Sequence, residues 1–243
     1  PIVAACIAFV IVLTTVIIPT AKYNRAVEKY GKEWADTVKN ASVGDTITFG
    51  AYEQDNNTSN GKEAIEWTVL DKDGMSLLLI SKQALDCQQY NTSYTDVTWE
   101  SCSLRKWMNG TFLNKAFNAE EQAQIQNTTV SADKNPEYNT NPGNATTDKV
   151  FLLSINEVEK YFNSDEARKC APTAYAKAQG AYTSDIYKTA SGAATCWWWL
   201  RSPGNSQYYA ATVFIDGSVN YLGHTVYYAN DAVRPALWIN LDS

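Results

Sequence analysis

The chain has 243 residues, of which 45% are hydrophobic and 12% aromatic, and a formal net charge of -6. Its length and hydrophobic content allow a sizeable core and exclude a disordered tail. The acidic balance argues against nucleic acid as a partner, because phosphate binding requires a basic surface.

The amino-terminal segment from Pro1 to Pro19 carries no charge. As a helix it would span roughly 28 Å at about 1.5 Å per residue, which is close to the thickness of a bilayer core. The apolar run is longer than that of a typical signal peptide, and no cleavage-like motif follows it. We therefore predict a transmembrane helix over residues 1–19 that anchors the protein in the membrane. A secretory signal peptide is the alternative.

Residues 20–42 have a helical composition and are predicted to form a juxtamembrane stalk, followed by one domain over residues 43–243. Lys and Arg outnumber acidic residues in the stalk, which alone would place the carboxyl side in the cytoplasm. The body rich in Asn, Thr, Ser and Tyr favours the opposite orientation. Because the chain begins on Pro1 rather than Met, we expect further residues ahead of it.

The cysteines leave two alternatives open. Cys6 lies in the predicted membrane helix, and the remaining four are Cys87, Cys102, Cys170 and Cys196. An even number could form two disulfides in an oxidising compartment, or all four could be buried free thiols. No C-x-x-C spacing occurs, so neither a zinc ribbon nor a thioredoxin-like site is expected.

The first half of the domain alternates strand and helix patterns. Strands are predicted at 43–54, 65–71 and 76–82, with a turn at Asp73-Gly74. Apolar residues at helical spacing predict a helix over 103–117, with Ser101 or Ser103 as its cap. Further predicted elements are a short helix at 119–126 capped by Asn118, a strand at 127–133, a buried strand at 149–154, a helix at 155–162 with a Ser154–Glu157 capping box, and a helix at 173–182.

The carboxyl-terminal part is predicted to be mainly strands. "CWWWLRSPG" at 196–204 and "RPALWINL" at 234–241 have the apolar content of buried strands. Two further strands flank Asp216-Gly217, the strongest hairpin signal in the chain. Strands come early and late and no βαβ repeat occurs, so the predicted class is α+β with a mixed or antiparallel sheet and flanking helices.

The sequence offers few residues for catalysis. His224 is the only histidine, so a catalytic triad would have to use it. No metal-ligating cluster or complete calcium loop occurs, and we predict neither a metal nor another cofactor. Tryptophans are more often core residues than ligand platforms, and Arg at strand ends more often bridges carbonyls or carboxylates than acts in catalysis. We therefore predict structural roles for Trp198, Trp238, Arg201 and Arg234, and no catalytic residue.

Three blocks together resemble a known family: "TWESCSLRKWMNGTFLNKAF", "DKVFLLSINEVEKYF" and "WWLRSPG…DGSV…VRPALWINL". They are similar to bacterial surface domains of unknown function with a C-type lectin-like fold, distantly related to formylglycine-generating enzymes. The resemblance covers residues 43–241 and implies a single-pass cell-membrane protein with its carboxyl-terminal domain outside the cell. No cysteine can be matched to the catalytic pair of the enzymes, so their activity is not implied.

Some relatives also resemble variable proteins of diversity-generating retroelements. There, mutated codons can yield Asn, Tyr, Ser or His but never Lys, Glu, Gln, Met or Trp, and residues 205–232 contain one of these five, Gln207. An ordinary surface hairpin is the alternative. The resemblance implies a fixed frame at Ala210, Ala211, Val213, Asp216 to Val219 including Gly217, Gly223, Val226 and Val233 to Leu237. The implied ligand-binding positions are Asn205, Tyr208, Tyr209, Thr212, Phe214, Ile215, Asn220, Tyr221, Leu222, His224, Thr225, Tyr227, Tyr228, Ala229 and Asn230.

The leading hypothesis from the sequence is thus a surface-displayed domain that binds a protein or peptide through residues 205–231. Tyr offers a large contact area at low entropic cost, and small polar residues adapt their hydrogen bonds. Two alternatives remain at this stage. One is an enzyme of the formylglycine-generating type, and the other is a structural envelope module without a specific ligand.

Overall fold

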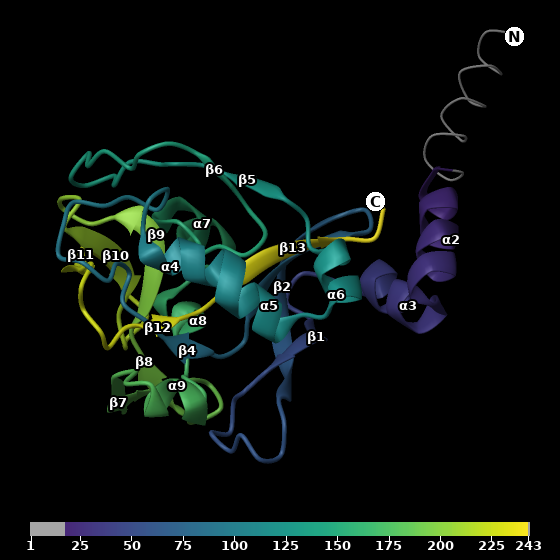
Figure 1. Ribbon diagram of the computed structural model, residues 1–243, viewed down its shortest axis with the longest axis horizontal. Coiled ribbons are helices and arrows are strands. Elements are labelled where there is room, and N and C mark those ends of the chain that lie inside the picture. The colour runs from purple at the N-terminus through teal and green to yellow at the C-terminus, as the bar shows by residue number, and fades with distance from the viewer. Residues whose placement is uncertain (1–17, 243) are drawn as a thin grey trace, which may run out of the picture.

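Two sheets organise the molecule in the computed structural model, which describes residues 18–242 (Figure 1). One sheet has the order β1-β2-β3-β13, and the other has the order β11-β10-β9-β12-β4. The first sheet consists of β1 Thr46–Tyr52, β2 Glu63–Asp73, β3 Ser76–Ser81 and β13 Ala236–Asn240. The second consists of β4 Asp86–Cys87, β9 Trp198–Pro203, β10 Tyr209–Val213, β11 Val219–Thr225 and β12 Ala232–Val233.

Neighbouring strands in both sheets are antiparallel except β12 and β9, which are parallel. Two small hairpin-like sheets complete the strands. They pair β5 Thr128–Val130 with β6 Thr146–Asp148, and β7 Thr183–Lys188 with β8 Ala194–Cys196. The α+β class and the mixed and antiparallel sheets predicted from the pattern of elements are therefore present.

Helices cover the sheets and their edges. Side-chain caps set several helix starts. Ser154 forms the predicted capping box with Glu157. Asn118 caps its helix as predicted and also forms a capping box with Glu121. The 103–117 helix is instead capped by the Cys102 thiol, and its middle turn is π-helical. The helical segments are α2 Ile18–Tyr30, α3 Lys32–Asn40, α4 Ser103–Trp107, η2 Met108–Phe112, α5 Leu113–Ala116, α6 Ala119–Gln124, α7 Ile155–Tyr161, α8 Asp165–Arg168 and α9 Ala174–Ala178.

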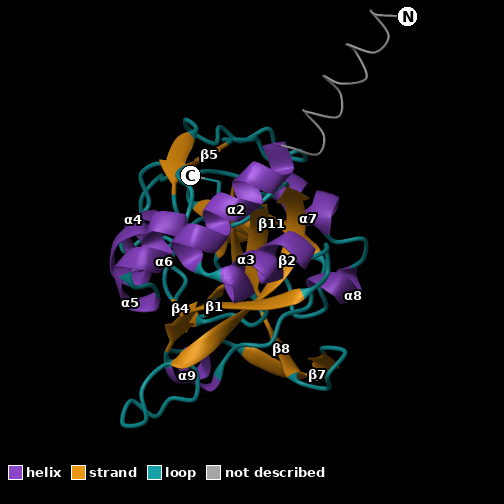
Figure 2. Ribbon diagram, turned by 90° about the vertical axis from the view of Figure 1, so that its right-hand side faces the viewer, coloured by secondary structure: helices purple, strands orange, loops and turns teal. Residues whose placement is uncertain are grey.

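The amino-terminal helices pack against the domain (Figure 2). On α3, Ala35 and Val38 are buried, and the Trp34 ring stacks on Phe49 of β1 with centroids 5.6 Å apart. The Trp34 indole also donates to Gln124 of α6 at 2.6 Å. The segment predicted as a stalk is thus helical, and α3 contributes to the core through its apolar face.

The predicted membrane helix requires a correction. Within residues 18–242, no helix is both long enough and apolar enough to cross a bilayer. The first described helix, α2, contains Lys22, Arg25, Glu28 and Lys29, whose charges are costly in hydrocarbon. The predicted fold with a transmembrane helix, and the cell-membrane location drawn from it, are corrected accordingly. Residues 1–17 of that prediction lie outside the described residues.

A second correction concerns the segment 149–154, predicted as a buried strand. It is buried, but it forms only one isolated bridge, between Phe151 and Ala236. Side chains form hydrogen bonds with the backbone N–H and carbonyl groups that would otherwise pair with a neighbouring strand. The Asn109 amide bonds both Val150 N–H and Val150 carbonyl, and Arg201 donates to the Leu152 carbonyl at 2.9 Å. The apolar run therefore packs in the core without joining a sheet.

The three consecutive tryptophans do not alternate between buried and exposed side chains. Trp198 and Trp199 are both fully buried, whereas Trp197 is half-buried. This is possible because β9 lies between β10 and β12 and all of its residues are buried, so that both of its faces are covered. Each buried indole donates to a carbonyl: Trp198 to Arg168 and Trp199 to Gln88. Trp197 is left as the one member of the run that reaches the surface.

Candidate ligand-binding surface

The β10–β11 hairpin is closed by a tight turn at Asp216-Gly217. The Asp216 carboxylate accepts from the backbone N–H and the hydroxyl of Ser218 at 2.9 and 2.7 Å. Gly217 has a φ of +89°, which a side chain would strain. Arg168 of α8 donates to the Gly217 carbonyl at 2.8 Å and ties the turn to the body. The hairpin is therefore held from its tip as well as through its ladder.

A cluster of aromatic rings lies on this hairpin and its neighbours. We call Tyr182, Trp197, Phe214, His224 and Tyr228 the aromatic cluster. Tyr182 stacks on Trp197 with centroids 4.2 Å apart, and His224 lies 5.0 Å from Trp197, 5.2 Å from Tyr228 and 5.8 Å from Phe214. Tyr182 and Tyr228 remain 43% and 37% exposed. The cluster thus joins three chain segments into one partly exposed aromatic surface.

A buried carboxylate fixes the centre of the cluster. His224 Nδ1 lies 2.8 and 3.0 Å from the two carboxylate oxygens of Asp231, a residue with no exposed surface. Burial raises the pKa of the Asp231 carboxyl, and His224 opposes that shift. An unpaired buried carboxylate is costly, so Asp231 constrains both the position and the identity of His224. His224 is therefore less exchangeable than the other surface positions.

A second aromatic contact lies beside the same hairpin. Tyr94 and Tyr208 are 61% and 38% exposed, and their ring centroids are 5.2 Å apart. Backbone bonds connect the two segments to residues near the cluster: Val226 N–H donates to the Tyr208 carbonyl, and Asn91 N–H donates to the Val226 carbonyl. The residues around 91–97 thus support the surface, although the sequence patterns did not assign them to it.

The predicted ligand-binding positions divide by exposure. Thr212 and Asn220 are buried and bond each other, with Asn220 Nδ2 donating to Thr212 Oγ1 at 3.3 Å, so their prediction as displayed residues is corrected. Both side chains form hydrogen bonds within the hairpin, where the Asn220 side-chain carbonyl oxygen also accepts from the Gly223 N–H. Half-buried positions are Tyr209, Phe214, Ile215, Tyr221, His224 and Thr225, and exposed positions are Asn205, Tyr208, Leu222, Tyr227, Tyr228, Ala229 and Asn230.

Tyr221 belongs to a different environment from Tyr227 and Tyr228. Its hydroxyl donates to Glu159 of α7, and its ring packs against the core. Burial and the Glu159 carboxylate raise the pKa of Tyr221 to about 12. Tyr227 and Tyr228 are instead 50% and 37% exposed. The three tyrosines therefore do not form one contact group.

Most residues predicted to be structural are buried. Trp198, Arg201, Gly217, Gly223 and Arg234 all lie inside the molecule. The Arg234 guanidinium lies 5.0 Å from the Trp198 ring centroid and donates to the Ser81 carbonyl at 3.0 Å. Trp238 differs, since it is half-buried and lines a cavity.

The four cysteines of the domain are free and buried. Burial raises the pKa of Cys87 and of Cys102 to about 12. Cys196 lies beside Cys170 and its thiol donates to the Cys170 carbonyl at 3.4 Å. Burial also acts to raise the pKa of Cys170, but the contact with Cys196 and the charge of Arg234 outweigh it and lower the value. Since neither thiol is accessible, the pair offers the enzyme alternative no exposed nucleophile.

This burial predicts the thiol reactivity. In a Cys6→Ser background, we expect native protein to react with a disulfide reagent such as DTNB at none of the four remaining cysteines within minutes, and to react at all four in guanidinium chloride. Thiolate attack requires access as well as a favourable pKa, so Cys170 should be protected with the others. Rapid reaction of any thiol in the native protein would show that its segment opens to solvent.

Sequence patterns missed several residues of this surface. Trp197 and Tyr182 belong to the aromatic cluster, Asp231 holds His224 within it, and Tyr94 forms the second aromatic contact. An acidic residue seven positions after the only histidine was a usable signal for Asp231. Tyr182 and Tyr94 come from distant segments, and only the tertiary structure brings them to the hairpin.

Residues 74–241, more than half of the chain, match the family described as a domain of unknown function, DUF6273. The chain belongs to this family. The DUF6273 region contains β3, both strands of the β10–β11 hairpin and every residue of the aromatic cluster, while α2, α3 and β1 precede it. No curated protein and no solved structure matches the chain. The function of this DUF6273 protein has therefore to be argued from its geometry.

Proposed function

We propose that this DUF6273 protein is a recognition domain that binds a protein or peptide ligand through the aromatic cluster and the exposed residues of the β10–β11 hairpin. The observation that carries the proposal is the cluster itself, with exposed Tyr182 and Tyr228 around His224 and its buried partner Asp231. Aromatic side chains that are rigidly held lose little entropy on binding and dominate binding energy in protein interfaces.

The support beneath the cluster favours binding without large rearrangement. Ala210 and Val213 of β10 and Trp199 of the neighbouring strand β9 are fully buried, and the turn is tied to α8 through Arg168. Preorganised contact residues lower the entropic cost of association. The exposed side chains contribute little to the packing of the core. Replacing them should therefore change ligand affinity more than the stability of the fold.

The separation of exposed hairpin positions from buried core residues supports a second part of the proposal. We propose that the exposed positions are diversified as in retroelement variable proteins. All but two of the predicted positions have solvent access, and the region 205–232 contains a single residue type that adenine mutagenesis cannot produce, Gln207. A near-copy of the 3′ end of the gene, differing at template adenines and adjacent to a reverse transcriptase gene, is the expected genomic arrangement. A neighbourhood with neither feature would contradict diversification and leave ligand binding to be tested separately.

The binding proposal predicts a specific effect of removing two exposed rings. A random peptide library displayed on phage should yield peptides that bind the wild-type protein, and Tyr182→Ala/Tyr228→Ala should weaken their binding at least tenfold, since buried aromatic contacts at interfaces often contribute about 2 kcal/mol or more. Affinity would be measured by biolayer interferometry. The melting temperature should fall by only a few degrees, because both side chains are partly exposed.

Tyr187→Ala is the matched control. Tyr187 is 38% exposed, like Tyr228, but lies on the β7–β8 hairpin with its ring near Lys169. We expect this variant to bind selected peptides as the wild type does. Equal binding by the double variant, or failure to enrich any peptide on the wild type, would contradict the proposal.

A further inference from the structure

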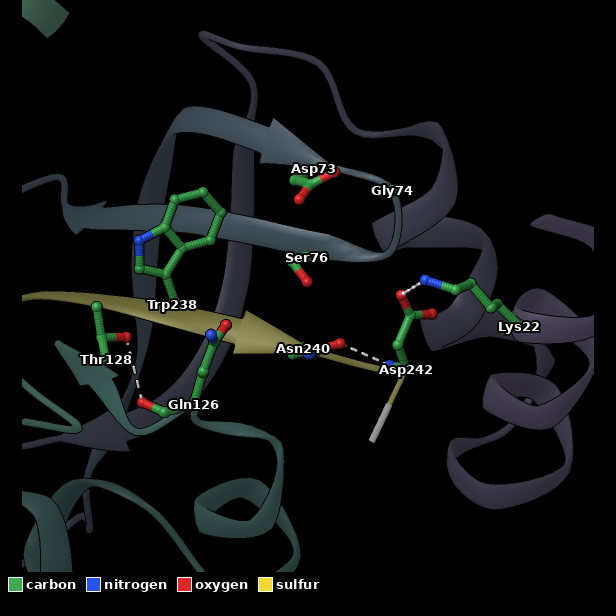
Figure 3. A pocket seen from close by; sticks show the side chains of 9 residues that line it. All are labelled: Lys22, Asp73, Gly74, Ser76, Gln126, Thr128, Trp238, Asn240 and Asp242. Atoms are coloured by element: carbon green, nitrogen blue, oxygen red, sulfur yellow. Dashed lines mark hydrogen bonds and ion pairs between the residues drawn. The ribbon is translucent and has the colours of Figure 1, made fainter. Parts of the chain in front are cut away.

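A cavity of about 400 Å³ lies at the opposite end of the molecule from the aromatic cluster. It opens between the end of β13, the β2–β3 turn and helix α2 (Figure 3). In Figure 1, β13 runs from the middle of the molecule toward the end where α2 lies, and β10 and β11 lie at the other end. A volume of this size lies within the range of about 300–1,000 Å³ that small-molecule sites occupy. The cavity is therefore separate from the proposed peptide surface.

Trp238 provides one apolar wall of this Trp238 cavity. Its ring is half-buried and stands over the sheet face in Figure 3. Trp67, Trp198 and Trp199 are buried, and each donates its indole N–H to a carbonyl. The Trp238 indole N–H has no acceptor among residues 18–242. A flat aromatic face is thus presented to the cavity.

Strand register places a row of polar side chains next to this ring. Asp73 pairs with Ser76, and Ser76 pairs with Asn240, so the three side chains lie on one face across β2, β3 and β13. Asn240 is two residues from Trp238 on the same strand and shares its face. Gln126 approaches from the opposite wall, anchored by its backbone N–H to the Trp238 carbonyl at 2.8 Å. Carboxylate, hydroxyl and amide groups therefore line the cavity beside the Trp238 ring.

The charges of the lining narrow the class of ligand. Lys22 of α2 pairs with Asp242 at 2.7 Å, so its charge is already matched. The other oxygen of Asp242 is buried and has no hydrogen-bond partner in the described structure, and Asp73 adds another carboxylate. A phosphate or carboxylate ligand would meet these acceptors without an available cation. The lining instead suits a neutral ligand with many hydroxyl donors.

We propose that the Trp238 cavity binds a saccharide. A pyranose ring has an apolar C–H face that can stack on the indole, and its hydroxyls can donate to Asp73 and Asp242 and exchange hydrogen bonds with Gln126 and Ser76. The contacts come directly from protein side chains, so binding should persist when divalent cations are chelated.

The proposal is tested with the full chain on an array of immobilised mono- and oligosaccharides in the presence of EDTA. We expect at least one saccharide to bind, and titration calorimetry with that saccharide should show a loss of affinity of at least tenfold for Trp238→Ala. Gln126→Ala should also weaken binding. Because Gln126 is exposed, this second variant keeps the test valid if Trp238→Ala fails to fold.

The Tyr182→Ala/Tyr228→Ala variant separates this site from the proposed peptide surface, since it should bind the saccharide as the wild type does. Absence of binding to every array saccharide would overturn the inference. Saccharide binding that is lost in the tyrosine variant but kept in both cavity variants would also overturn it. Calorimetric binding of cationic amines at the cavity, without binding of any saccharide, would overturn it as well. Absence of saccharide binding would leave the proposal of peptide binding by the aromatic cluster unaffected.

Discussion

Replacing Arg201 by Ala should lower the free energy of unfolding by about 3–5 kcal/mol, because it breaks a partly buried ion pair and leaves backbone acceptors without a donor. Arg201 is 3% exposed and pairs with both carboxylate oxygens of Glu157. It also donates to the Leu152 carbonyl at 2.9 Å and the Ser131 carbonyl at 3.2 Å. The change would be measured by urea denaturation monitored by tryptophan fluorescence.

Two further variants make this result specific. Arg25→Ala removes an exposed arginine of α2 and should change stability by less than about 0.5 kcal/mol. Arg201→Lys keeps the charge but lacks the planar fork, so it should lie between the wild type and Arg201→Ala. A loss below about 1 kcal/mol for Arg201→Ala would mean that water replaces the arginine contacts, and that the 150–153 segment does not depend on them.

The same arginine shows where sequence reasoning succeeds and where it stops. Its position at the end of an apolar run predicted a structural role, since a guanidinium there needs carbonyl or carboxylate partners. In the structure Arg201 lies within β9, and its guanidinium bonds a carboxylate and two carbonyls. The partners themselves could not be predicted. Leu152 belongs to a run whose composition matches a strand, and only the tertiary bonds from Arg201 and Asn109 explain why no ladder forms.

Local patterns with a short physical range were the most predictive. Both capping boxes involve residues three positions apart, and the Asp216-Gly217 turn depends on neighbouring residues alone. The hairpin was therefore predictable, but its environment was not. The exposure of Thr212 depends on β10 lying between β9 and β11, which composition cannot reveal. Similarly, Trp238 has the residue type of a core position, yet the end of β13 is only partly covered.

The second large effect is expected at the tip of the hairpin. Gly217→Ala should lower the free energy of unfolding by about 2–4 kcal/mol, combining backbone strain at positive φ with steric overlap. A Cβ at this position would lie 1.8 Å from the Asp165 carbonyl oxygen of α8. The turn cannot move away cheaply, because Arg168 of the same helix holds the Gly217 carbonyl.

Gly192→Ala isolates the steric part of this effect. Gly192 has a φ of +83°, close to the +89° of Gly217, but a Cβ there would meet no atom within 4 Å. Both substitutions carry similar backbone strain, of about 1 kcal/mol, so the difference between them measures the contact with α8. We expect Gly217→Ala to be the more destabilising by at least about 1 kcal/mol in parallel urea titrations.

The comparison also tests the rigid support on which the binding proposal depends. If the hairpin tip is fixed against α8, Gly217→Ala must either unfold part of the structure or displace β10 and β11, and in both cases Phe214 and His224 lose their positions in the aromatic cluster. Peptide affinity should then fall although no contact residue has changed. Equal stability losses for the two glycine variants would show that the tip moves freely, and preorganisation would no longer explain how the exposed rings achieve binding.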